Sequence, residues 1–201
     1  MFKSKKYICA ILGLLALGCS LVCAVEIEEG TLKKPGRNKV VLVGKVSLKN
    51  PIDYAAREPA FKAMKIDWLF PPKNRDFYYT VKGFDFENNP DFGQTFFAEA
   101  KVQKDGTVRI EEFMAWIFGH TNDNFWFRLP AMVDITVPEG AQYVYVGNFQ
   151  YDLDYALRAI DLQHLDEFSS AQEELNRALG EKGDLYRGEL KFLTPEDLKE
   201  K

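Results

Sequence analysis

The sequence predicts a mainly β protein, an antiparallel sandwich of two sheets with one helix packed on it near the C-terminus. Three observations lead to this prediction. From Val40 onward, short segments alternate apolar and polar residues with a period of two. Turn-forming residues separate these segments at short intervals, as in all-β proteins. One later segment, residues 166–180, carries its apolar residues at helical spacing instead.

The first strands are separated by a long irregular stretch. Residues 39–49 are rich in β-branched side chains, and Gly44 within them indicates a bulge or a point of close packing. Residues 50–75 contain four prolines and predict a long loop, which is either a binding loop or a packed insert. Residues 76–86 predict the next strand.

The middle of the chain predicts most of the sandwich. Residues 95–118 form the clearest predicted hairpin, with Asp105 and Gly106 at the two positive-φ positions of a type I′ turn. The other strands are expected at residues 124–129, 132–137, 141–155, with Gly147 inside it, and 188–193.

Residues 166–180 predict the helix. Ser170 and Glu173 fit a capping box, and Gly180 lies where a glycine is expected to end a helix. Its apolar stripe predicts a face that packs against the sandwich. Thr194 fits the N-cap of a last turn within a C-terminal tail of residues 194–201.

Residues 1–24 predict a secretory signal peptide. Three lysines precede an apolar run, and small residues follow it. Cleavage between Ala24 and Val25 satisfies the preference of signal peptidase for small residues. It would leave residues 25–38 as a linker before a single domain of residues 39–193.

Cys19 follows Gly18 and is a competing site of lipidation. The apolar character that continues beyond the central run leaves an uncleaved anchor as a further alternative. Contact with a membrane is expected only through a lipid on Cys19 or through this segment. A signal of this type, together with the absence of an N-x-[ST] sequon, favours a bacterial source.

Composition excludes several classes of function. Removal of residues 1–24, which hold three lysines and no acids, changes the net charge from −4 to −7. An acidic chain disfavours nucleic acid as a partner, and the basic run of residues 33–39 reads as a solvated linker. All three cysteines precede Ala24, so the cleaved chain has no thiol for catalysis or for zinc. No cofactor is predicted.

No catalytic or metal site is predicted. Asp152 and Asp154 would project from one face of a strand at a spacing that a glycosidase can use, but no cleft residue accompanies them. His120 lies in a polar turn with one carboxylate, too few for a calcium loop. His164 lies near two aspartates whose spacing does not suit one helical face. Motifs for a nucleophile elbow, a P-loop or a zinc protease are absent.

Aromatic residues are the remaining candidates for contact with a ligand or partner. The consecutive rings of residues 125–127 cannot all lie on one face of a strand. Because exposed aromatic side chains mark contact surfaces, four residues are predicted to touch a ligand or partner: Trp68, Trp116, Phe118 and Trp126.

The segment of residues 125–151, FWFRLP…ITVPEGAQYVYVGNFQY, resembles the last strands of transthyretin-like and carboxypeptidase-regulatory-like sandwiches in bacterial envelope proteins. An F-x-[FL]-x-L strand, a P-x-G turn and a Tyr-rich strand carry the resemblance. It implies a seven-strand Ig-like topology and an accessory or binding role, and it transfers no functional residue. A small lipocalin-like barrel with a helix is the alternative, although Gly44-Lys45-Val46 stands where that family has G-x-W.

These features predict a non-enzymatic, exported protein of the cell envelope that binds a protein partner or a surface ligand. It is expected in the periplasm or at the cell surface, either soluble or lipid-anchored. One alternative is a carrier of a small apolar ligand in an aromatic-lined cavity. The other is a hydrolase whose catalytic residues are dispersed along the chain.

Overall fold

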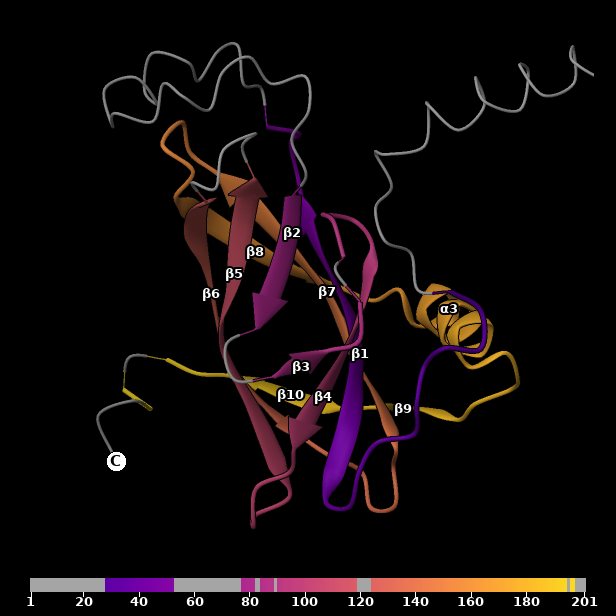
Figure 1. The fold of residues 1–201 in the computed structure, drawn as a ribbon. Helices are drawn as coiled ribbons and strands as arrows, with labels where there is room; N and C mark the ends of the chain where they lie inside the picture. Colours follow the sequence, from indigo (N-terminus) through magenta and orange to yellow (C-terminus); the bar gives the residue numbers. More distant parts are fainter. Residues whose placement is uncertain are drawn as a thin grey trace, which may run out of the picture.

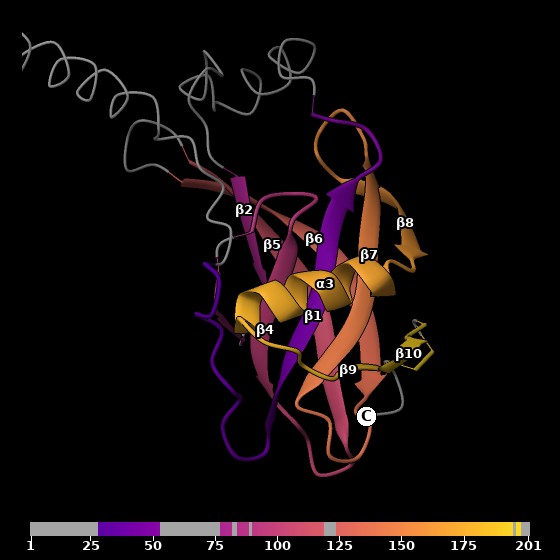
Figure 2. The same ribbon diagram turned by 90° about the vertical axis from the view of Figure 1, so that its right-hand side faces the viewer.

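The structure is a computed structural model that describes residues 28–52, 77–81, 84–88, 90–118, 124–194 and 196–197. Its strands form two facing sheets, and helix α3 (Phe168–Leu179) crosses the outer face of the first sheet (Figures 1 and 2). The predicted mainly β sandwich with one packed helix is therefore confirmed. The lipocalin-like alternative is wrong, since the described strands divide between two sheets rather than closing into one barrel.

The first sheet has six strands in the order β3–β4–β1–β7–β8, with β9 also paired to β7. Their bounds are β1 (Lys39–Leu48), β3 (Asp85–Phe86), β4 (Thr95–Lys101), β7 (Tyr143–Leu153), β8 (Ala159–Leu165) and β9 (Leu185–Arg187). The central pair, β1 and β7, is parallel, as is the pair of β7 and β9. This centre departs from the purely antiparallel arrangement that the sequence predicts.

The second sheet has four antiparallel strands in the order β10–β6–β5–β2. They are β2 (Phe77–Val81), β5 (Thr107–Phe118), β6 (Asn124–Thr136) and β10 (Glu189–Phe192). The predicted edge strand at residues 188–193 is confirmed as β10. Residues 76–86, predicted as one strand, contribute β2 to this sheet and β3 to the other.

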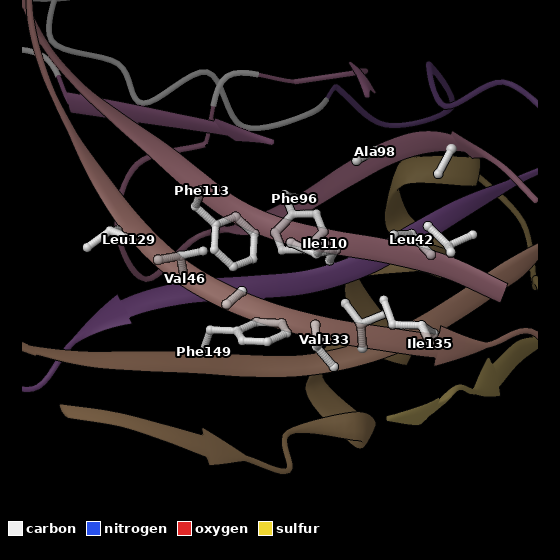
Figure 3. Close-up of a cluster of buried hydrophobic side chains, with 14 of the residues drawn as sticks. Leu42, Val46, Phe96, Ala98, Ile110, Phe113, Leu129, Val133, Ile135 and Phe149 are labelled. Atoms are coloured by element: carbon white, nitrogen blue, oxygen red, sulfur yellow. The ribbon is translucent and has the colours of Figure 1, made fainter. Parts of the chain in front are cut away.

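The centre of the first sheet is buried on both faces. One face packs on the second sheet, where the Phe113 ring lies 5.9 Å from Phe96 and 5.1 Å from Phe149 between ring centroids (Figure 3). The other face packs under α3, whose Leu175 is fully buried. Strands covered on both faces carry nearly continuous apolar residues, which explains the sequence VVLV at the start of β1.

A bulge interrupts the parallel pair at two facing glycines. Val43 pairs with Tyr145 and Gly44 pairs with Gly147, so Val146 is the extra residue of β7. Gly147 has a φ of 87°, and its missing side chain leaves room for the ring of His164, whose Nε2 lies 2.9 Å from the carbonyl oxygen of Val146. The bulge or close packing predicted at Gly44 is confirmed.

The predicted hairpin at residues 95–118 is wrong, because β4 and β5 belong to different sheets. Gly106 has a φ of 79°, whereas Asp105 has no positive φ and accepts hydrogen bonds from the N–H (3.1 Å) and hydroxyl (2.7 Å) of Thr107. The turn carries the chain from one layer to the other. Local alternation looks the same whether the two flanking strands pair or separate.

Residues 124–137, predicted as two strands, form the single strand β6. Pro130 pairs with Glu112, and the register then shifts before Val133 reaches Ile110. Met132 has a φ of 46° at this bulge. Because a bulge tolerates a residue without an N–H, Pro130 bends the strand and does not end it.

Strands β8 and β9 have no counterpart among the predicted elements. In β8, the half-buried positions recur every third residue, at Ala159, Leu162 and Leu165, so the period of two is lost. β9 has only three residues and is defined by its partner β7 rather than by its own pattern.

Replacing Gly147 with alanine is expected to lower the free energy of unfolding by about 3 kcal/mol or more, measured in urea. A Cβ there would lie 1.9 Å from His164 Nε2, in a backbone conformation that alanine disfavours. Gly93→Ala is the matched control: φ is 86°, but no heavy atom lies within 4 Å of the added carbon. Strain alone should cost about 1–2 kcal/mol there. Equal losses in both variants would contradict this account of the bulge.

Candidate functional site

The N-terminal end of α3 is tied to the first sheet by a paired polar network. Glu167, the N-cap residue, accepts hydrogen bonds from Lys45 Nζ and from Asn148 Nδ2, both at 2.8 Å. Ser47 donates to Asn148 Oδ1 at 2.8 Å, and the N–H of Glu167 donates to the hydroxyl of Tyr145. The network fixes where the helix begins on the sheet.

The capping box predicted at Ser170 and Glu173 is wrong, because α3 begins at Phe168. The N–H of Phe168 donates to Asp166 Oδ1 at 3.1 Å, while the side chain of Glu167 makes no capping bond. Contacts with the sheet thus start the helix earlier than its local sequence indicates.

The C-terminal end of α3 is closed by the chain segment that precedes β1. The predicted terminating glycine is confirmed, since Gly180 has a φ of 69° and its N–H donates to Arg177 O at 3.1 Å. Leu32 N–H donates to Ala178 O at 3.0 Å, and Gly30 N–H donates to Arg177 O at 3.3 Å. These donors satisfy carbonyls that a helix end leaves free. Part of the predicted linker, residues 25–38, therefore packs beside the helix.

Two side chains of α3 hold the loop of residues 181–184, which runs back below the helix to β9 (Figure 2). Asn176 Oδ1 accepts the N–H of Gly183 at 3.0 Å, and Gln172 Nε2 donates to Gly183 O at 2.9 Å. Gln172 Oε1 also accepts the N–H of Leu185 at 3.3 Å. The loop is fixed against the helix on one side and against the start of β9 on the other.

A hollow of about 230 Å³ lies among these fixed segments. At about 30 Å³ per water molecule, its volume is that of about eight waters. Its wall comes from the segment before β1, the turn before β7 and the start of β7, the end of α3 with its following loop, and β9. The wall residues are Lys34, Gly140, Gln142, Tyr143, Leu179, Glu181, Lys182, Gly183, Asp184 and Tyr186.

Tyr143 stands out in this wall because its hydroxyl has no hydrogen-bond partner. The residue is 4% exposed, and among the described side chains its hydroxyl is the single buried polar atom left unpaired. Burial, and secondarily the negative charge of Glu181, raise the pKa of Tyr143, so the hydroxyl stays protonated and can donate. An unpaired buried hydroxyl costs about 1–3 kcal/mol, so it needs a reason.

Four charged side chains surround the same hollow: Lys34, Glu181, Lys182 and Asp184. Within the described part of the chain none of them makes a hydrogen bond or an ion pair. Elsewhere, charges of the first sheet are paired, as Lys39 is with Glu99 and Lys45 with Glu167. The wall of the hollow therefore contains two cations and two anions that are exposed to solvent, together with Tyr143, whose unpaired hydroxyl has no contact with solvent.

The described wall of this hollow contains none of the predicted aromatic contact residues, three of which lie in strands of the second sheet. Trp116 lies in β5 opposite Trp126 in β6, and Phe118 lies opposite Asn124. For these three aromatic residues the structure describes the backbone and not the side chain. Other sequence predictions fall outside the described residues: Cys19, Ala24, Val25, Trp68, His120 and residues 53–75 of the long loop.

The expectation that Asp152 and Asp154 share one strand face is wrong, because β7 ends at Leu153. Asp152 accepts a hydrogen bond from Lys49 Nζ at 3.3 Å. Asp154 caps the next turn, where the backbone N–H and guanidinium of Arg158 lower its pKa. The two carboxylates therefore serve separate local contacts.

His164 lies in a strand, not in the helical turn that the metal hypothesis considers. Of its two neighbouring aspartates, Asp161 accepts its neighbour's N–H and Asp166 pairs with Arg187 at 3.0 Å. The described residues contain no group of three or more His, Cys, Asp or Glu placed to hold a metal ion. They also include no helix long and apolar enough to cross a membrane.

No family model, curated protein or solved structure matches this chain.

Tyr143→Phe is expected to leave the free energy of unfolding unchanged or to raise it by up to about 1 kcal/mol, because it removes an unpaired buried hydroxyl. Tyr151→Phe is the control, since its fully buried hydroxyl donates to Pro130 O at 2.9 Å. That variant should lose about 1–2 kcal/mol. Urea unfolding of both proteins measures the difference, and a comparable loss in Tyr143→Phe would mean that its hydroxyl has a protein partner.

Acidification is expected to weaken the attachment of α3 through Glu167. The hydrogen bond from Lys45, aided by Asn148, lowers the pKa of Glu167 below its ordinary value of 4.5. A lowered pKa in the folded state stabilises the protein above pH 4.5, and this stability is lost as the pH falls below that value. Unfolding free energies measured from pH 6 to pH 3 should fall less in Glu167→Gln than in the parent protein. Glu173→Gln, on the exposed side of α3, should retain the full pH dependence.

Proposed function

We propose that this protein is a non-enzymatic, exported binding protein of the cell envelope that holds a polar ligand in the hollow beside the C-terminal end of α3. The signal-peptide pattern of residues 1–24 supports export, with release after Ala24 or a lipid on Cys19 as the two outcomes. The hollow supports binding.

The unpaired hydroxyl of Tyr143 is the observation that carries the proposal. Folding leaves this donor buried without an acceptor and without contact with solvent, so a ligand removes that cost by displacing the atoms that cover the hydroxyl and supplying an acceptor. The surrounding wall is held in place by Gln172 and Asn176 on one side and by the bonds of Leu32 on the other. A site built in advance costs less conformational entropy when it binds.

The polar wall favours hydrophilic ligands over apolar ones. An apolar molecule in this hollow would remove water from four free charges without replacing their hydrogen bonds. The carrier of an apolar ligand remains a second candidate because of a separate hollow of about 330 Å³, whose wall includes Leu48, Ile52 and Phe92.

A calorimetric screen of the purified protein against small polar metabolites, soluble oligosaccharides and an apolar fluorescent probe tests the proposal. We expect a polar compound to bind, and Tyr143→Phe to weaken it about tenfold through loss of one hydrogen bond. Lys104→Gln, on the turn between the sheets, is the control and should bind as the parent does. Saturable binding of the apolar probe alone would favour the carrier. Binding of no compound, or polar binding that ignores Tyr143→Phe, would contradict the proposed site.

A further inference from the structure

We infer that the hollow takes a small zwitterion, a molecule with one carboxylate and one ammonium group, of the kind that free amino acids represent. The inference rests on the proposed function and narrows it to one class of ligand. It is drawn from the balance of charges in the wall and from the unpaired buried hydroxyl of Tyr143, which is one of the wall residues.

The balance of charge in the wall is even. Lys34 and Lys182 oppose Glu181 and Asp184, and none of the four has a partner in the described part of the chain. A ligand with a single charge would pair with one sign and be repelled by the other. A zwitterion pairs with both signs at once, so no charge in the hollow is left facing a like charge.

The wall also orients such a ligand. Once a ligand displaces the atoms that cover it, the protonated hydroxyl of Tyr143 donates best to an anionic oxygen, so the ligand carboxylate belongs with Tyr143 and the two lysines. Glu181 lies in the loop after α3, in the same wall. With Asp184 it supplies the acceptors for the ligand ammonium group.

The size of the hollow limits the ligand to a small molecule. About 230 Å³ accommodates a group of atoms that displaces about eight waters, which suits a single amino acid. The loop of Glu181, Lys182 and Asp184 is pinned at its centre through Gly183, while Lys34 approaches from a different segment. The charges thus reach the hollow from two sides.

The test measures binding of free L-amino acids by calorimetry and carries the tightest one into a set of four compounds. The free amino acid carries both charges, and its C-terminal amide carries only the ammonium charge. Its N-acetyl derivative carries only the carboxylate charge, and its N-acetyl amide carries neither. We expect the free amino acid to bind at least about fivefold tighter than either singly charged compound, the scale of one exposed ion pair.

Paired variants assign the two ends of the ligand. In Glu181→Gln/Asp184→Asn, the N-acetyl derivative should bind as well as the free amino acid, because the negative charges that attract the ammonium group are gone. In Lys34→Gln/Lys182→Gln, the amide should bind as well as the free amino acid. Lys104→Gln/Glu111→Gln, whose residues lie outside the hollow, is the control and should retain the full preference.

The outcomes separate this inference from the proposed function. Equal or tighter binding of a singly charged or uncharged compound would overturn the zwitterion. The zwitterion would also be overturned if the protein bound no amino acid but bound another polar compound. If Tyr143→Phe weakened that binding, the hollow would still be the binding site. A protein that binds no ligand of any class would contradict the site itself.

Discussion

The parallel pairing of β1 with β7 is the contact on which the other layers depend. It joins the two central strands of the first sheet. The second sheet covers one face of this pair, and α3 covers the other. The bulge at Val146 keeps both faces supplied with apolar residues: Val144 and Val146 point into the sandwich, whereas Tyr143 and Tyr145 lie under the helix. The carbonyl oxygen of Val146 forms a hydrogen bond with His164 Nε2 at this bulge.

The hollow is a consequence of how the helix layer is attached to this pair. Asn148, which follows the bulge in β7, donates a hydrogen bond to Glu167 and so fixes the start of α3. At the other end, Leu32 and the loop of residues 181–184 close around the end of the helix. Tyr143 begins β7 at that point, so its hydroxyl is buried by the closure without being given a partner. If Tyr143 only packed the core, a phenylalanine would avoid the free-energy cost of an unpaired buried hydroxyl. The buried hydroxyl of Tyr151, by contrast, donates a hydrogen bond to a backbone carbonyl.

Sequence patterns predict the elements of this fold better than their partners. β-Branched residues identify β1, and alternating tyrosine and valine residues identify β7. Gly44 and Gly180 correctly predict a bulge and the end of the helix. The turn at Asp105 cannot reveal that its two strands enter different sheets, since both layers use the same alternation. Strand β8 escapes prediction because an edge strand buries only every third residue.

The candidate site is harder to predict, for physical reasons. Residues 181–184 read as an ordinary solvated turn after a helix, and the basic run containing Lys34 reads as a linker. What joins them is the set of backbone bonds between Leu32 and the end of α3, which no local pattern encodes. Tyr143 looks like any other core residue of a Tyr-rich strand until its hydroxyl is seen without a partner.

A high-resolution crystal structure of the protein grown with its tightest-binding amino acid would show whether the hollow is the binding site. The account predicts an ordered ligand in the hollow with a carboxylate oxygen within hydrogen-bonding distance, about 2.5–3.0 Å, of the Tyr143 hydroxyl. A Tyr143 hydroxyl bonded to a protein group, with the ligand bound elsewhere or the hollow filled by side chains, would contradict it.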